Sequence, residues 1–209
     1  MLRAAPRGLA AQPGMGPAGR PNLRGGARVM TDDQCMATER LRLRPLKLDD
    51  AARIHALIND WNVLRTLASP PYPYRREHAE EFLAAALRKH KLGSATIFAI
   101  AQEEGLIGLI GIEPRERGPT LGYWLGRAYW GRGYMSEAAA ALVHHYFRFP
   151  GNDRLVSGYF AGNGASWRIQ DKLGFRFAGE RMLHSRPWGK ELPYIDTLLT
   201  RQRFETLYG

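Results

Sequence analysis

LGYWLGRAYWGRGYMSEAAAALVHHYF, residues 121–147, decides the fold, because a strand-like segment, a glycine turn and an alanine-rich helix follow one another in it without a gap. Gly131 and Gly133 lack the Cβ atoms that would keep a ligand away from the backbone. The helix after them begins with N–H groups that have no partner within the helix, and its aligned peptide dipoles add about half a positive charge there. This order of elements predicts a site for an anion such as a pyrophosphate.

The composition indicates one globular domain. The chain has 209 residues, of which 44% are hydrophobic and 24% charged, so it can bury one sizeable core without metal or disulfide staples. Cys35 is the one cysteine, which excludes an internal disulfide. The apolar runs at 106–112 and 138–143 are far shorter than the roughly 20 residues that cross a bilayer. We expect a soluble, cytoplasmic protein without a membrane partner.

The net charge of +10 is unevenly distributed. Five arginines and no acidic residue precede Asp32, so half of the excess belongs to the first 30 residues. We expect residues 1–37 to be a disordered basic tail and residues 38–209 to form the domain. The tail also resembles an organellar transit peptide in part. An alternative is that translation of the functional protein starts at Met30 or Met36. Because the tail is separate from the domain, direct nucleic-acid binding is not expected.

The periodicity from Glu39 onward predicts the element order β-α-α-β-β-β-α-β-α-β-β. This order is typical of an α/β protein with a mixed, mostly antiparallel, seven-stranded twisted sheet flanked by helices. The helix at 134–149 connects the strands at 120–126 and 154–161, which should therefore be parallel. This arrangement places the glycine turn at the carboxyl end of a strand. Strands are expected at 40–44, 95–102, 106–112, 120–126, 154–161, 175–182 and 194–201, and helices at 49–59, 75–91, 134–149 and 165–173.

The glycine turn does not match the two best-known phosphate loops. A Walker A loop needs Gly-Lys-Ser/Thr after a longer spacer, and a dinucleotide fingerprint needs a third glycine where Ser136 stands. The remaining class with a glycine turn before a helix is the turn that binds an acyl-CoA.

Four motifs resemble the GNAT N-acetyltransferase superfamily, and within it the branch that acetylates ribosomal-protein N-termini (RimJ/RimL type). The resemblance covers about residues 39–204. The family's Gln-x-x-Gly-x-Gly/Ala turn would begin at Ala128, so its leading glutamine is missing here. The motifs are Thr38–Arg44, Gly122–Leu125, Tyr129–Ala138, and Asn163–Ser166 with Lys172–Phe175.

The resemblance implies that acetyl-CoA is the cosubstrate, with no tightly bound cofactor and no metal. The turn and the start of the helix would hold its pyrophosphate through backbone N–H groups, with charge from Arg132. The end of the preceding strand would pair with the pantetheine arm, and the Asn163 amide would bond to the same arm. The implied cosubstrate-binding residues are Trp124, Leu125, Gly126, Gly131, Arg132, Gly133, Tyr134, Met135, Asn163 and Ser166.

The implied reaction transfers an acetyl group from a thioester to a primary amine. Many relatives protonate the sulfur with a tyrosine seven residues after the asparagine, but Gln170 stands there, so Ser166 is the expected sulfur partner. The alternative for Ser166 is a first-turn residue satisfied by the backbone. Glu113 is the expected general base through water, or else a solvated residue at a strand end, and His184 is the second choice. The oxyanion donor would be a backbone N–H near Leu125.

The acceptor is the least determined part. Five aromatic side chains lie in the two connections expected to flank it, where they could form a channel for a peptide end or could serve packing alone: Trp61, Tyr72, Tyr74, His184 and Trp188. The expected acceptor is a protein N-terminal α-amine, with a small amine such as an amino acid, polyamine or antibiotic as the alternative. A non-catalytic acyl-CoA-binding module is a further alternative. Nothing in the sequence separates a monomer from a homodimer.

Overall fold

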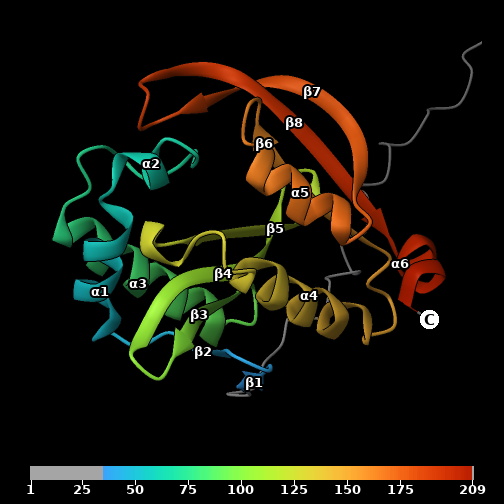
Figure 1. Ribbon diagram of the computed structural model, residues 1–209, viewed down its shortest axis with the longest axis horizontal. Helices are drawn as coiled ribbons and strands as arrows, with labels where there is room; N and C mark the ends of the chain where they lie inside the picture. Colours follow the sequence, from blue (N-terminus) through green and yellow to red (C-terminus); the bar gives the residue numbers. More distant parts are fainter. Residues whose placement is uncertain (1–34, 209) are drawn as a thin grey trace, which may run out of the picture.

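The computed structural model of the chain describes residues 35–208 (Figure 1). Most of the expected basic tail therefore lies outside the described residues. Of its last three residues, Met36 and Ala37 form a short strand paired with the next one, so regular structure begins before the expected boundary at residue 38. The elements are β1 (Met36–Ala37), β2 (Arg42–Pro45), α1 (Asp50–Ile58), α2 (Trp61–Leu64), α3 (Arg76–Lys91), β3 (Thr96–Gln102), β4 (Gly105–Arg115), β5 (Gly118–Leu125), η1 (Arg127–Tyr129), α4 (Tyr134–Phe147), β6 (Arg154–Phe160), α5 (Gly164–Lys172), β7 (Arg176–Ser185), β8 (Lys190–Thr200) and α6 (Arg201–Tyr208).

The strands form one mixed sheet in the order β1-β2-β3-β4-β5-β6-β8-β7. Neighbouring strands are antiparallel except β5 and β6, which are parallel, as the crossover through α4 requires. The predicted α/β class and the mostly antiparallel sheet are confirmed. Within residues 35–208 the sheet has eight strands where seven were predicted, because the two residues of β1 add an edge strand that is too short to produce a periodic pattern.

The sheet separates two hydrophobic cores. Alternate residues of β3 point to opposite faces, so Phe98 and Ile100 join one core and Ala99 the other. The first core lies under α4, whose buried Ala138, Leu142 and other residues recur at helical spacing. The second core lies under α1 and α3. Figure 1 shows α1 and α3 at one side of the molecule and α4 and α5 at the other.

Two helices and one strand boundary differ from the prediction. The helix α2 lies in a connection expected to be irregular. The helix α6 follows β8 directly, and its Phe204 stacks on Phe147 of α4 with ring centroids 4.7 Å apart, so tertiary packing stabilises it. The last two strands extend to a tight turn at 186–189, where Gly189 has φ of 61°. His184 is therefore on β7 opposite Glu191, and the prediction that it lies in a loop is wrong.

Among the helices that the structure describes, none combines the length and the apolar character that a membrane-spanning segment requires.

Candidate functional site

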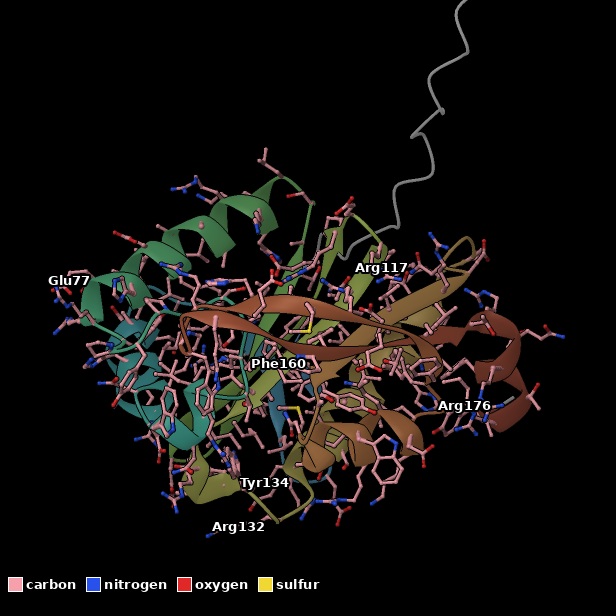
Figure 2. The ribbon with its side chains drawn as sticks, turned by 90° about the horizontal axis from the view of Figure 1, so that it is seen from above. Glu77, Arg117, Arg132, Tyr134, Phe160 and Arg176 are labelled. Atoms are coloured by element: carbon pink, nitrogen blue, oxygen red, sulfur yellow. The ribbon has the colours of Figure 1, made fainter. Side chains whose placement is uncertain are left out.

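The glycine turn has an open backbone at the start of α4. Gly131 and Gly133 have φ of 74° and 80°, in the left-handed region that favours glycine. A Cβ added to Gly131 would meet no atom within 4 Å, so the space above this residue is free. Figure 2 shows Arg132 and Tyr134 at the surface of the molecule beside this turn. The turn thus offers a helix N-terminus, an approachable backbone and an arginine to an anion.

A network from the beginning of the domain holds this turn in place. The Arg40 guanidinium donates to the Arg132 carbonyl at 3.0 Å and pairs with Glu137 in the first turn of α4 at 2.7 Å. Thr38 also donates to Glu137. Burial raises the pKa of Glu137, but the hydrogen bonds from Thr38 and Arg40 and the charge of Arg40 outweigh it and lower the pKa overall. Arg40 thereby neutralises a carboxylate that would repel an anion at the helix start.

The strands β5 and β6 separate beyond their first residues. They pair at Thr120 opposite Val156 and, among the described residues, at no further position. The Ser157 hydroxyl of β6 donates to the Leu121 carbonyl at 3.0 Å, just beyond that pair. Beyond Leu121 the side of β5 that faces β6 is therefore open between the two strands.

The register shows which backbone groups face this split. The Gly126 N–H donates to the Ile107 carbonyl of β4 at 2.9 Å. Since an antiparallel strand bonds to one neighbour through every second residue, Trp124 also bonds toward β4, while Tyr123 and Leu125 direct their N–H and C=O groups toward the split. Of the three residues expected to pair with pantetheine, only Leu125 has this orientation. Its carbonyl accepts from the Trp130 indole at 2.8 Å, so its N–H remains for a ligand in the split.

Ser166 lies across the split from β5 and contacts Tyr123. It is in the first turn of α5, where its N–H donates to the Asn163 side chain at 3.2 Å, so Asn163 caps this helix. The Ser166 and Tyr123 hydroxyl oxygens are 2.9 Å apart. The Gln170 amide nitrogen lies 3.0 Å from the former and 3.2 Å from the latter. Ser166 is thus more than a residue satisfied by the backbone, because two side chains bond to its hydroxyl.

Tyr123 was not singled out by sequence reasoning. The alternation of Leu121, Tyr123 and Leu125 along β5 could have placed it on the face of α4 and α5, where Leu121 and Leu125 are buried. Burial raises the pKa of Tyr123, and the hydrogen bonds from Ser166 and Gln170 offset this in part. The hydroxyl is therefore protonated at neutral pH and can donate.

Glu113 is held in ion pairs near the end of β4. Lys89 of α3 pairs with one carboxylate oxygen at 2.8 Å and Arg115 with the other at 3.2 Å. Burial raises the pKa of Glu113, but the two cations and their hydrogen bonds lower it overall. Both oxygens are engaged and their basicity is reduced, so Glu113 is a weaker general base than the prediction needs.

Three of the five expected acceptor residues form an aromatic cluster. The Trp61 ring lies 4.9 Å from the Tyr72 ring and 4.8 Å from the Trp188 ring, centroid to centroid. Tyr72 is 52% and Trp188 39% exposed. Tyr74 is instead buried in the core under α1 and α3, where burial and then the charge of Glu81 raise its pKa to about 12. His184 is exposed on β7 and belongs to none of the aromatic pairs among the described residues.

The turn between β7 and β8 closes onto the chain after α2. The Arg186 N–H donates to the Ala68 carbonyl at 2.9 Å, and the Trp188 indole donates to the Arg65 carbonyl at 3.1 Å. Figure 1 shows β7 and β8 reaching over α2. These bonds join the two connections expected to flank the acceptor. Together they hold the aromatic cluster, which consists of Trp61, Tyr72 and Trp188.

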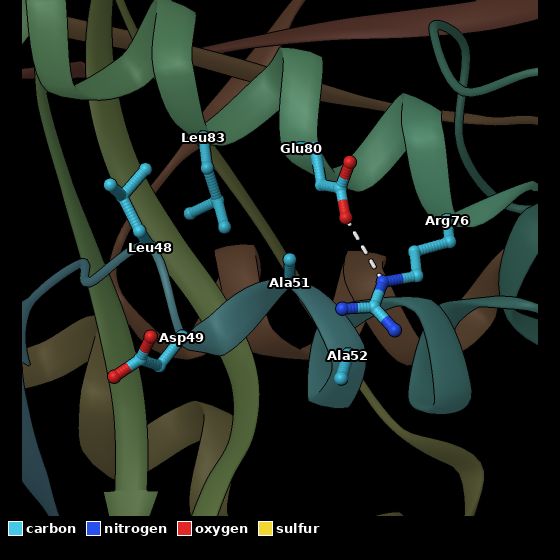
Figure 3. Close-up of a pocket in the computed structure, with 7 residues that line it drawn as sticks. All are labelled: Leu48, Asp49, Ala51, Ala52, Arg76, Glu80 and Leu83. Carbon is cyan, nitrogen blue, oxygen red and sulfur yellow. Dashed lines mark hydrogen bonds and ion pairs between the residues drawn. The ribbon is translucent and has the colours of Figure 1, made fainter.

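A cavity of about 420 Å³ lies elsewhere, between the start of α1 and α3 (Figure 3). The Arg76–Glu80 pair, 2.9 Å apart, lies on its wall. None of the candidate site residues lines it, so we assign it no role. The cavity is lined by Leu48, Asp49, Ala51, Ala52, Arg76, Glu80 and Leu83.

Within residues 35–208 there is no group of three or more His, Cys, Asp or Glu side chains that could hold a metal ion.

Comparison with known proteins gives a consistent result. A family model described as the acetyltransferase (GNAT) domain matches residues 40–176. The ribosomal-protein-serine acetyltransferase of Escherichia coli is 29% identical over 147 residues, which are 68% of this chain and 82% of that protein. The solved structure of RimL, a ribosomal L7/L12 α-N-protein acetyltransferase in complex with coenzyme A, is similar with a TM-score of 0.71 and 21% identity, over 80% of this chain and 98% of that one. The microcin C7 self-immunity acetyltransferase MccE, in complex with acetyl-CoA and AMP, has a TM-score of 0.69 at 20% identity, over 78% of this chain and 93% of that one.

Proposed function

This chain belongs to the GNAT acetyltransferase family, and we propose that the amine it acetylates is the α-amine at the N-terminus of a protein. The reaction type and the cosubstrate follow from the family: the chain is an N-acetyltransferase that uses acetyl-CoA. The proposed acceptor is more specific than the family-level reaction. It is supported by the aromatic cluster and by the named acceptor of the Escherichia coli relative.

The residues present fit acetyl-CoA. The open backbone at Gly131, with the N–H groups at the start of α4, suits the pyrophosphate. The Tyr123 backbone groups that face the split suit the amides of the pantetheine arm. When bound, acetyl-CoA supplies a thioester carbonyl that is open to attack by an amine. We assign to the Leu125 N–H the stabilisation of the oxygen of that carbonyl as charge develops on it.

The observation that carries the acceptor proposal is the aromatic cluster where two distant connections meet. Its rings come from α2, the chain after α2 and the β7–β8 turn. Two of the three rings are well exposed, which suits a peptide that extends along the surface, whereas a small amine is usually enclosed. Aromatic side chains provide rigid contact area at low entropic cost, as a varied peptide end requires.

The amine needs only modest activation. A protein α-amine has an ordinary pKa of about 7.7–8.0, so a sizeable fraction is uncharged near neutral pH. Water can accept the proton that the amine loses as it attacks. Glu113, whose pKa is lowered by its ion pairs, is not required for this step. On the leaving side, we assign proton donation to Ser166, whose hydroxyl lies across the split from β5.

Thiol release from acetyl-CoA tests the proposal. The acceptors are peptides with different N-terminal residues, the same peptides with a blocked α-amine, and a panel of amino acids, polyamines and aminoglycosides. The proposal expects turnover with free N-termini, none with the blocked versions, and at most weak turnover with the small amines. Efficient turnover of a small amine, with none of any peptide, would replace it with the alternative.

A further inference from the structure

Two hydroxyl groups from separate elements meet at the split and share one donor. The Tyr123 oxygen from β5 and the Ser166 oxygen from α5 are 2.9 Å apart. Ser166 is 9% and Gln170 1% exposed, so water has little access to these contacts. Both hydroxyl groups contact the third side chain, Gln170. The other partners of Gln170 therefore determine which hydroxyl donates its proton to the other.

The orientation of the Gln170 amide is fixed on both sides. The Thr197 hydroxyl of β8 donates to its oxygen at 2.6 Å. The Gly158 carbonyl, which can only accept, lies 3.1 Å from its nitrogen. The nitrogen therefore faces the two hydroxyl groups: one of its N–H groups donates to the Gly158 carbonyl, and the two hydroxyl oxygens share the other. Neither hydroxyl can donate its own proton to Gln170.

One proton then joins the two hydroxyl groups. A phenol, with an ordinary pKa of about 10, is a stronger acid than the aliphatic alcohol of serine, so Tyr123 donates and Ser166 accepts. The other acceptor near the Tyr123 hydroxyl is the Ser166 backbone carbonyl at 3.4 Å, at the limit of a hydrogen bond. Ser166 accepts from Tyr123 and Gln170, and its own proton remains for a group outside the cluster.

We propose that Tyr123 is a positioning residue that supplies, through Ser166, the proton taken up by the leaving sulfur. As the carbon–sulfur bond breaks, its electron pair goes to sulfur, Ser166 gives its proton to that sulfur, and Tyr123 gives its proton to the Ser166 oxygen. The Gln170 N–H stabilises the resulting phenolate. After the thiol has left, a proton returns to Tyr123 through Ser166 from the solvent, which has received one from the attacking amine, so the protons balance.

This relay accounts for Gln170 at the position where many relatives have a tyrosine. The phenol comes from β5 instead of α5, and Gln170 orients it together with Ser166. The proposal rests on acetyl transfer at this site and holds for whichever amine is the acceptor. An alkoxide left on Ser166 would be far more costly than a phenolate, which is why Ser166 needs a second donor.

Tyr123→Phe tests the relay, because the ring that packs in the core is kept and only the hydroxyl is lost. With the best acceptor from the screen above, kcat should fall by roughly 10- to 100-fold. The KM for acetyl-CoA, and its Kd measured by calorimetry without acceptor, should stay within about threefold of the parent, because the relay acts on the leaving group and not on ground-state binding. Tyr146→Phe is the matched control: it removes another buried tyrosine hydroxyl of the same core, which donates to the Arg154 carbonyl at 3.0 Å, and kcat should not change.

A double-mutant cycle shows whether Tyr123 acts through Ser166. Tyr123→Phe should cause no further loss of kcat in a Ser166→Ala protein, and denaturant unfolding of the same four proteins should show a non-additive effect of the two hydroxyl groups. Gln170→Met, which removes the shared donor, should lower kcat in the parent and not in Ser166→Ala. An unchanged kcat in Tyr123→Phe, or losses that multiply in the double mutant, would overturn the relay. Acetylation of small amines alone would refute the proposed acceptor and leave the cycle measurable.

Discussion

Replacing Gly131 by alanine tests whether the turn before α4 binds the cosubstrate. Gly131 has φ of 74°, and a side chain in this region costs about 1 kcal/mol. A Cβ there meets no protein atom within 4 Å, so no clash adds to this cost. The melting temperature should therefore fall by about 2–4 °C, as expected for a domain of this size.

The effect on ligand affinity has a separate origin. The backbone strain is present in both the free and the bound protein, so it cancels in the binding free energy. The new methyl group, in contrast, would occupy the space through which a phosphate oxygen would reach the backbone in the assigned site. Loss of one charge-assisted hydrogen bond costs about 1.5–3 kcal/mol, which weakens the Kd for coenzyme A by roughly 10- to 100-fold.

Gly151→Ala is the matched control. Gly151 has φ of 92° and an equally open Cβ position, and it lies between α4 and β6, away from the turn. Both variants should show a similar thermal shift by circular dichroism, and calorimetry with coenzyme A should show weaker binding for Gly131→Ala alone. Equal Kd values for the two variants and the parent would refute the assignment of the turn.

Four further predictions concern other parts of the molecule. Glu113→Gln should change kcat by less than about threefold and keep the acidic limb of the pH–rate profile, whereas removal of a general base costs about 100-fold or more. The pKa of Glu137 is lowered in the folded protein, so its carboxylate stabilises the fold above the ordinary pKa of 4.5. This contribution is lost as pH falls through the folded pKa. Glu137→Gln should therefore flatten the acidic part of a plot of melting temperature against pH. Trp188→Ala should raise the KM for a peptide by about tenfold, since aromatic pairs contribute about 0.5–1.5 kcal/mol beyond their buried area. The Kd for acetyl-CoA should not change. Phe177→Ala, at another exposed aromatic residue, serves as the control. Gly158→Ala should lower the free energy of unfolding by about 1–3 kcal/mol in denaturant titrations, because its Cβ would overlap the Tyr194 ring and the backbone of β8.

The parts of the fold that the sequence predicts are those with local signals. The turn and α4 are marked by two glycines and a run of alanines, and the structure has both where they were expected. The short helix α5 follows an asparagine that caps it. In contrast, α6 depends on contacts of Phe204 with α4, more than fifty residues earlier in the chain, and no local pattern reports such a contact. The turn at 186–189 does contain Pro187 and Gly189, which could have moved His184 onto a strand.

The candidate site divides in the same way. Gly131 and Gly133 are recognisable because their chemistry depends on the backbone of a continuous segment. The contact of Tyr123 with Ser166 joins β5 to the helix α5, and alternation along β5 places Tyr123 on a face without revealing its partner there. The weak basicity of Glu113 likewise comes from Lys89 on another element. Sequence reasoning identified Ser166 but could not identify the groups that give its hydroxyl a direction.

The aromatic cluster has a consequence for the order in which the molecule is completed. The turn to which we assign the cosubstrate lies within the fifteen consecutive residues of 121–135, whereas the cluster joins Trp61 and Trp188. Contacts between such distant segments form late, and a chain leaves the ribosome N-terminus first. During synthesis, Trp61 and Tyr72 remain exposed until the β7–β8 turn has emerged and bonded to Arg65 and Ala68. In the proposed function, a newly made chain thus gains the elements for its donor before those for its acceptor.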